Sequence, residues 1–330
     1  MILKMPALLL SASCHLSRLF SQSRFVSFST RLIKMDLVVD IADRYFFTKY
    51  NIYPGDWSED YWLRQCFSSA ILCYIGGTTI YLTVSPLVFW FIFDHRLMKH
   101  PLFLKNQIRR EMWMSLTAGI FLCLLTSVVL LLELRGYSKL YSMDEIDVTV
   151  YEAIVLVIRD SVGLILFSDC LIYWIHRFLH HRYIYRHLHK QHHKWKIPTP
   201  FASIAFHPFD GFLQSVPYHI YPCIFPTNRH AYLVLFFLVI VWTISIHDGD
   251  YRVPTVLRPF INGSAHHTDH HLFYNYNYGQ YFTFWDRIAG SYRSPSVYEG
   301  VSLVDAVNKK ATKVIDEGEC NGYVGKAHEG

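Results

Sequence analysis

Two long stretches without a charged residue constrain the fold of this chain more than any other feature. The first runs from about Ser68 to Phe93, and the second from Trp113 to Leu132. A helix rises 1.5 Å per residue, so each stretch is long enough to cross a hydrocarbon core of about 30 Å. The chain has 330 residues and is 52% hydrophobic and 17% aromatic, which is unusual for a soluble enzyme. We therefore predict an all-α integral membrane protein.

Further apolar segments raise the predicted number of transmembrane helices to about four. The stretch from Val148 to Ile175 contains Arg159, Asp160 and Asp169, which are costly in lipid and should face protein or a polar cavity. Arg159 and Asp160 either pair with each other or mark a boundary between two helices. The runs 212–225 and 231–246 are each too short for a confident span. Together they predict a helical hairpin, and the pattern does not settle whether the hairpin crosses the membrane.

Basic residues set the predicted orientation of these helices. The segment 94–111 lies between the first two apolar stretches and carries five lysines and arginines, so the positive-inside rule makes it cytoplasmic. The loop 133–147 is more acidic and suits the opposite side. The segment 176–196, which is dense in Arg, Lys and His, then returns to the cytoplasm, and the predicted hairpin brings the region after it back to the same side.

Histidines are concentrated between His176 and His271, a region with fifteen of the nineteen in the chain. They form three groups with helical spacing, so that residues three and four apart share a face. Imidazole suits Fe, Zn, Cu and Ni, and no cysteine pair accompanies the groups to suggest a closed zinc finger. A histidine-rich loop can also be a loose metal-binding tract, but the regular spacing favours a dimetal centre in a cytoplasmic, histidine-rich helical cap. The groups are His176-Arg-Phe-Leu-His180, His189-Lys-Gln-His192-His193 and His266-His267-Thr-Asp-His270-His271.

The absence of common cofactor-binding and nucleophile motifs limits the reactions that this centre could carry out without a partner protein. The sequence contains no Gly-rich dinucleotide fingerprint, P-loop or nucleophile elbow, so electrons for a redox reaction would have to come from a separate protein. Iron with open coordination positions can activate dioxygen, whereas zinc fits the same ligands but has no redox chemistry. The basic segments 94–111 and 177–196 are either a docking surface for an acidic electron carrier or simple topological charge. Nothing in the sequence predicts a nucleic-acid partner.

Four stretches of the chain resemble the membrane fatty acid hydroxylase and sterol desaturase superfamily, and most closely its sterol C5-desaturases. The resemblance covers about Met35 to Gly300. It implies a multi-pass enzyme of the endoplasmic reticulum that acts in cholesterol biosynthesis. The reaction would place a C5–C6 double bond in a Δ7-sterol such as lathosterol, giving 7-dehydrocholesterol. The stretches are Phe93-Asp-His-Arg-Leu-Met-Lys-His-Pro101, Trp195-Lys-Ile-Pro-Thr-Pro-Phe-Ala-Ser203, Ile244-Ser-Ile-His-Asp-Gly-Asp250 and Pro259-Phe-Ile-Asn-Gly-Ser-Ala-His-His-Thr-Asp-His-His271.

The same resemblance implies two non-haem irons, dioxygen, and electrons from NADH through cytochrome b5 and its reductase. Zinc could replace iron in isolated protein. Two rival interpretations stay open: a related sterol or fatty-acid hydroxylase or 4-methyl oxidase, and a metal-binding membrane protein without enzymatic activity. The implied ligands are His176, His180, His189, His192, His193, His267, His270 and His271, with His247 and His266 as additions.

Several neighbouring residues are candidates for supporting roles. His207 is a ligand, a partner of a ligand or a sterol contact, and Asp248 and Asp269 could orient imidazoles by accepting their second N–H. The aromatic segments 201–212 and 273–285, the latter ending at Trp285, either line a sterol pocket or anchor the protein at the membrane interface.

The chain divides into four predicted regions. Residues 1–34 form an extension that is rich in basic residues and serine and lacks acidic residues. The extension is either a mitochondrial transit-like segment or dispensable, because Met35 is a second possible start. Residues 35–147 form a membrane region with two spans, residues 148–295 the catalytic region with three histidine groups, and residues 296–330 a polar tail.

Overall fold

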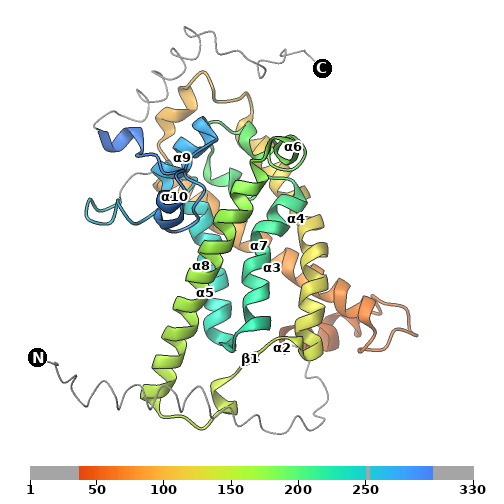
Figure 1. Cartoon of the computed structure of the whole chain (residues 1–330). Coiled ribbons are helices and arrows are strands. Elements are labelled where there is room, and N and C mark those ends of the chain that lie inside the picture. Colours follow the sequence, from red (N-terminus) through yellow and green to blue (C-terminus); the bar gives the residue numbers. More distant parts are fainter. Residues whose placement is uncertain (1–36, 250–252, 300–330) are drawn as a thin grey trace, which may run out of the picture.

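The computed structural model describes residues 37–249 and 253–299, and it is mostly helical. Its long helices run side by side and carry a cap of shorter elements at one end (Figure 1). The predicted extension 1–34 and most of the predicted tail 296–330 lie outside the described residues. The long helices are α3 (Trp62–Phe91), α4 (Gln107–Leu132), α5 (Val150–Leu179), α7 (Pro208–Ile224) and α8 (Arg229–Ser245).

Two of these helices are long and apolar enough to cross a membrane. They are α3 and the continuous segment Gln107–Tyr137, which begins with α4, and they match the two stretches predicted from the sequence. Helix α5 is 30 residues long but carries several charged side chains, and α7 and α8 have 17 residues each. The count of about four spans therefore stays a prediction.

Short elements connect the long helices. The helix α2 (Leu37–Ala42) and a π-helical turn (Asp43–Phe47) precede α3. The cap contains α6 (Arg182–Tyr185), α9 (Ser264–Phe273) and α10 (Phe284–Ile288). The other short elements are the strands β1 (Leu140–Tyr141) and β2 (Thr227–Asn228), the π-helical turn Glu133–Tyr137, and the 3-10 turns His95–Lys99, Met143–Glu145, His192–Lys194, Pro200–Ala202 and Ser296–Glu299.

The turn of the α7–α8 hairpin is fixed at the end of the molecule opposite the cap. Strand β2, in this turn, pairs in parallel with β1, which lies in the loop between α4 and α5. The carboxylate of Asp160 on α5 accepts hydrogen bonds from the Asn228 N–H at 2.8 Å and the Tyr141 hydroxyl at 2.7 Å. It also pairs with Arg159 at 2.7 Å, so these two residues form an ion pair within one continuous helix. The hairpin thus extends along α5 to its N-terminal half.

Buried polar contacts attach the segment after the second histidine group to the membrane helices. The carbonyl oxygen of Phe201 accepts hydrogen bonds from Tyr81 on α3 at 2.9 Å and from Ser115 on α4 at 3.0 Å. Glu111, which is fully buried, accepts hydrogen bonds from Gln107 and from the Thr199 hydroxyl. Because buried polar groups are costly without partners, this network fixes the cap relative to α3 and α4.

Candidate metal centre

The cap brings nine histidines from distant parts of the chain into two adjacent groups. Within each group the potential ligand atoms all lie within 4.8 Å of one another. The side chains are buried, apart from the half-buried His180. The first group is His176, His180, His189, His193 and His270, and the second is His192, His247, His267 and His271.

The spacing of the histidines explains how they divide between the groups. Side chains four residues apart on a helix lie above one another, whereas neighbours point about 100° apart. The pair His176 and His180 accordingly enters the first group, and the pair His267 and His271 enters the second. The third clustered histidine of α9, His270, belongs to the first group. One short helix therefore serves both groups, which sets them side by side.

The second histidine segment is not the α-helix that its spacing predicts. Residues 186–191 form hydrogen-bonded turns, and His192 begins a 3-10 turn of three residues. The His193 N–H still bonds to the His189 carbonyl oxygen at 3.3 Å, so His189 and His193 face the first group while His192 faces the second. The segment ends just before Ile197-Pro198, and because the proline ring disfavours the α conformation of the residue before it, the length available for a regular helix is limited.

Distances between ring nitrogens fit ligands that share a common ion. With a metal–nitrogen distance of about 2.0–2.1 Å, two ligand nitrogens on one tetrahedral or octahedral ion lie roughly 3 Å apart. The Nε2 atoms of His176 and His189 are 3.2 Å apart, and those of His193 and His180 are 3.1 Å apart. In the second group, the Nε2 atoms of His267 lie 3.0 Å from His247 and 3.1 Å from His271. The donor set present here therefore fits one metal ion in each group.

The opposite ring nitrogens are held by acceptors, as is common for metal-binding imidazoles. Nδ1 of His176 bonds to the Tyr278 carbonyl oxygen at 3.0 Å, and Nδ1 of His247 bonds to the Thr243 carbonyl oxygen at 2.7 Å. Nδ1 of His270 bonds to the Tyr276 carbonyl oxygen at 2.7 Å, while its buried Nε2 has no hydrogen-bond partner among the described residues. Each of these contacts directs Nε2 of the ring toward its group.

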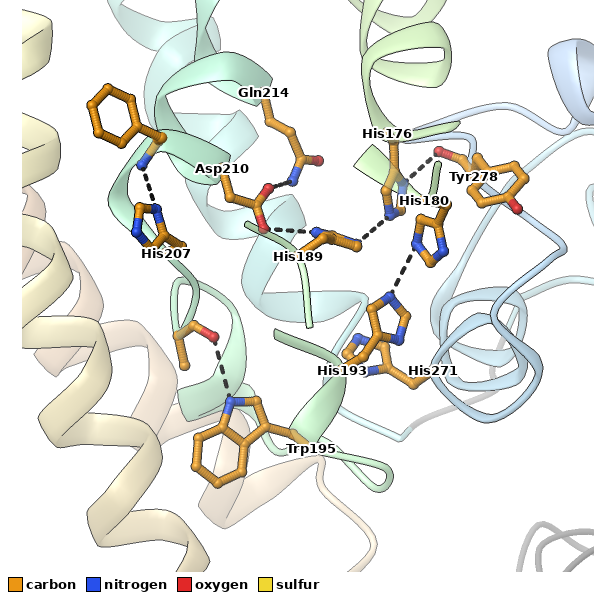
Figure 2. Close-up of polar contacts among 12 residues, drawn as sticks. His176, His180, His189, His193, Trp195, His207, Asp210, Gln214, His271 and Tyr278 are labelled. Atoms are coloured by element: carbon orange, nitrogen blue, oxygen red, sulfur yellow. Dashed lines mark hydrogen bonds and ion pairs between the residues drawn. The ribbon is translucent and has the colours of Figure 1, made fainter. Parts of the chain in front are cut away.

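A carboxylate performs this role for His189. Nδ1 of His189 lies 2.7 Å from Oδ2 of Asp210, and Figure 2 shows Asp210 on one side of this imidazole and His176 on the other. Gln214, one turn further along α7, donates to the second carboxylate oxygen of Asp210 at 2.7 Å. The sequence prediction named Asp248 and Asp269 for such a role and missed Asp210. Its position four residues before Gln214, at the N-terminus of α7 beside His207, was the available signal.

Burial favours the neutral form of the imidazoles in the cap. Desolvation, with a further contribution from neighbouring imidazoles, lowers the pKa of six of them well below 6.5. Desolvation lowers the pKa of His247 to about 4. Neutral imidazole is the form that binds metal, so the site is ready for ligation at physiological pH. The six are His180, His192, His193, His267, His270 and His271.

Four other predicted site residues lie outside the two groups. His266 is buried, but its ring packs against Tyr292 and Tyr298 instead. His207 caps α7, where its Nδ1 accepts the Phe209 N–H at 3.3 Å, and Figure 2 shows it away from the clustered imidazoles. Asp269 pairs with Arg293 at 3.4 Å. Asp248 is buried directly after His247.

A loop that the sequence prediction treated only as an aromatic segment supports the first group. Asp286 on α10 accepts hydrogen bonds from the N–H groups of Tyr278 and Gly279, both at 2.8 Å. Asp169 on α5 accepts from the N–H of Tyr281 at 2.8 Å. These buried carboxylates hold the loop whose Tyr278 carbonyl oxygen contacts His176. The only sequence signal for this role of Asp169 and Asp286 was weak, namely an acidic residue next to apolar ones.

A cavity of about 420 Å³ opens onto both groups. Its wall includes His176 of the first group and three histidines of the second. The rest of the wall comes mainly from α3, α4, α7 and α8 and is largely apolar. Pockets of roughly 300–1,000 Å³ commonly bind small organic ligands. The structure therefore provides an apolar binding site in direct contact with the candidate metal centre.

The two predicted aromatic segments contribute unequally to this cavity. The first segment, 201–212, supplies Ser203, Ile204, Phe206 and Gly211. The second segment, 273–285, supplies Gly279 and Gln280, while the Trp285 ring stacks on Tyr173 with centroids 6.5 Å apart. Trp285 thus supports α5 beside the site.

Comparisons with known proteins agree with this arrangement. Residues 161–291 match the fatty acid hydroxylase family, a segment that includes all nine clustered histidines. A lathosterol oxidase of Homo sapiens is 54% identical over 292 residues, which cover 88% of this chain and 94% of that protein. A Delta(7)-sterol 5(6)-desaturase of Eremothecium gossypii is 48% identical over 258 residues, covering 77% of this chain and 72% of that protein.

A lathosterol oxidase of Mus musculus is likewise 54% identical over 291 residues, covering 87% of this chain and 96% of that protein. No solved structure matches this chain. The similarity to these proteins extends through the membrane helices as well as the histidine-rich cap. The chain therefore belongs to the fatty acid hydroxylase family, in the branch that contains the lathosterol oxidases and the Delta(7)-sterol 5(6)-desaturases.

Proposed function

We propose that this protein is a membrane-bound sterol C5(6)-desaturase that converts a Δ7-sterol such as lathosterol to 7-dehydrocholesterol. The observation that carries the proposal is the contact between the apolar cavity and both histidine groups. A sterol in this cavity would have its ring carbons directly beside the metal centre. The names of the relatives, at 47–54% identity, support the substrate and the position of the new double bond.

The two histidine groups would hold two non-haem irons, the first through His176, His180, His189, His193 and His270 and the second through His192, His247, His267 and His271. Iron supplies the activation of dioxygen in this proposal. The reaction removes one hydrogen from C5 and one from C6, and two added electrons and two protons complete the reduction of dioxygen to two waters. The chain's own contribution is to orient the imidazoles, bind the sterol and keep bulk water from the buried ligands.

The electrons would come from NADH through cytochrome b5 and its reductase. Exposed basic side chains of the cap support an acidic partner, because complementary charge accelerates encounter. Arg182 and Arg186 lie between the first two histidine segments, Lys190 lies within the second, and all three are exposed. Reversing the charges of Arg186 and Lys190 should raise the KM for soluble cytochrome b5 and make this KM less dependent on salt concentration. The kcat at saturating cytochrome b5 should stay unchanged. Charge reversal of Arg44, before α3, is the control.

The proposed location is the endoplasmic reticulum membrane, with about four spans and the cap in the cytoplasm. The apolar helices α3 and α4 support membrane insertion, and the α7–α8 hairpin reaches the level of the α4–α5 loop. The basic segment 94–111 lies at the cap end of α3 and α4, which supports the cytoplasmic orientation. Engineered glycosylation sites in the α4–α5 loop should be modified, and sites in the cap should not.

Expression in cells that lack endogenous sterol C5-desaturation tests the activity. Microsomes supplied with lathosterol, NADH and oxygen should form 7-dehydrocholesterol, detected by gas chromatography and mass spectrometry. The matched His270→Ala variant should insert into the membrane equally well and form none. A hydroxylated sterol as the sole product would instead support the related hydroxylase function. Bound zinc without oxygen-dependent turnover would support a non-enzymatic protein.

A further inference from the structure

The cavity is elongated, with a histidine end and a far end. It is lined along α4 from Ser115 to Thr126, a length of about 16 Å at the helical rise per residue. Ser115 lies at the histidine end, because it bonds to Phe201 in the segment that follows the second histidine group. Phe236, near the middle of α8, lies about three turns before His247 and marks the far end with Thr126. A ligand must therefore lie lengthwise.

The reaction in the proposed function fixes which end of a sterol faces the histidines, and this inference rests on that function. C5 and C6 belong to the part of the ring system nearest the 3-hydroxyl, since only C4 separates C3 from C5. Because the proposed reaction places C5 and C6 beside the histidines, the 3-hydroxyl must also lie close to the histidine end. The hydrocarbon side chain, at the opposite end of the ring system, must extend toward the far end of the cavity.

A polar atom suited to the sterol hydroxyl is present near the histidine end. Ser203 lines the cavity, and its buried Oγ has no hydrogen-bond partner within the part of the chain that the structure describes. It belongs to the segment held by Ser115, and nearby Phe206 contacts the ring of His192 with centroids 5.9 Å apart. Unpartnered buried hydroxyls are costly, and a ligand hydroxyl would satisfy this one.

Open space lies next to two consecutive glycines of α3. Gly76, which is exposed, and Gly77, which is half-buried, both line the cavity, and a Cβ atom added at either would meet no atom of the described residues within 4 Å. They precede Tyr81, whose hydroxyl bonds to Phe201, by one turn or slightly more, on the side away from the histidines. Glycine within a helix is less favourable than alanine, so helix stability does not explain the pair.

We propose that the sterol binds with its 3-hydroxyl at Ser203 and its side chain along Gly76 and Gly77, which determine the side chains that the enzyme accepts. The absence of Cβ atoms leaves room for the branched hydrocarbon chain against the α3 backbone. A larger residue at either position would fill this room without a clash in the protein itself. The two glycines are thus specificity-determining residues of the proposed reaction.

The test compares wild type with Gly77→Leu and Gly76→Leu on Δ7-sterols that carry the full side chain, a shortened one or none. The kcat/KM of the variants for the full-length sterol should fall at least about tenfold relative to that for the side-chain-free sterol. Retained turnover of the shortest sterol shows that the variants fold and hold metal. Thr79→Leu, on the exposed face of α3 and away from the cavity, is the matched control and should match wild type.

The outcomes separate this binding mode from the proposed function. If wild type desaturates Δ7-sterols but the glycine variants lose or keep activity equally for every side-chain length, the binding mode is wrong and the function stands. If wild type desaturates no Δ7-sterol, the proposed function fails and the binding mode fails with it.

Ser203→Ala supplies an independent measurement of the other end of the binding mode, the contact with the 3-hydroxyl. It should raise KM for 3-hydroxy sterols and have little effect on the corresponding 3-deoxy sterols, and an equal effect on both would remove Ser203 from the site.

Discussion

The carboxylate of Asp210 lies 2.7 Å from Nδ1 of His189, and both side chains are buried. This contact fixes the ring orientation of His189 and makes its Nε2 a better ligand, as carboxylate partners of metal-bound histidines do. Asp210 itself is held by Gln214. The contact therefore links the start of α7 to the first histidine group.

Replacing Asp210 by alanine should lower metal affinity about 10–100-fold and reduce turnover correspondingly. The variant leaves Nδ1 of His189 without its acceptor and frees the ring to rotate. Asp210→Asn, which keeps one acceptor oxygen, should have a smaller effect, and Gln214→Ala a smaller one still. Metal content after dialysis against a chelator, together with turnover, measures these effects. Full metal retention in Asp210→Ala would show that the contact does not support ligation.

Alanine substitutions at two adjacent histidines of α9 should have different effects on metal content and turnover. His267 belongs to the second group, whereas His266 packs against two tyrosines outside it. His267→Ala should therefore lose metal from the second group and abolish turnover. His266→Ala should keep both metals. It should lower the thermal stability, because alanine leaves part of the buried site of the imidazole empty. Metal-to-protein ratio and melting temperature distinguish the two effects, and metal loss in His266→Ala would place that residue among the ligands.

Asp286→Ala should weaken the first group without touching a ligand. The substitution removes the acceptor of two backbone N–H groups at 2.8 Å, those of Tyr278 and Gly279. Leaving such buried donors unpaired costs about 1–3 kcal/mol each, so the loop that supports His176 should loosen. Ser291→Ala, which removes one bond to Asp286 and one to the Tyr173 hydroxyl but leaves both loop N–H groups paired, is the milder control. The expected result is a lower inactivation temperature with faster loss of metal, and unchanged values for both would contradict the role of this loop.

Lys196 should titrate at unusually low pH. Burial lowers its pKa to about 8, while its ammonium lies 3.9 Å from the centroid of the Tyr274 ring. The unfolded chain, with a lysine pKa of about 10.4, binds more protons than the folded chain between these values, so stability should rise with pH across this window. Lys196→Met should abolish that rise.

The pH dependence of acetylation at Lys196, followed by mass spectrometry, measures this pKa directly. A short synthetic peptide containing the same lysine supplies the unperturbed reference. The midpoint for the folded protein should lie near 8, well below that of the peptide. Equal midpoints would show that water reaches the ammonium freely.

Much of the site could be predicted from the sequence because its signals are local. Uncharged stretches predict α3 and α4, and i,i+4 spacing places His176 with His180 and His267 with His271. His189 and His193 keep this relation even though their segment forms turns.

The unpredicted parts depend on contacts between distant segments. The sequence could not separate His266 from its neighbours, since only the packing of Tyr292 and Tyr298 removes it from the cluster. Nor could it identify Asp210, which is 21 positions beyond His189 in the chain and reaches it only because α7 folds back beneath the cap. The cavity is likewise a product of helix packing, lined by residues of α3, α4, α5, α7 and α8 together with residues of the cap.

The distribution of the ligands along the chain has a consequence for biosynthesis. The long helices α3, α4, α5, α7 and α8 all precede Ser264, where α9 begins, and α9 contributes histidines to both groups. A ribosome must therefore translate past His271 before either group can be complete. A chain terminated between α8 and α9 would keep four of the five histidines of the first group but only His192 and His247 of the second. Such a truncated protein would carry an unequal pair of sites, and the second group in particular is completed only once α9 has been synthesised.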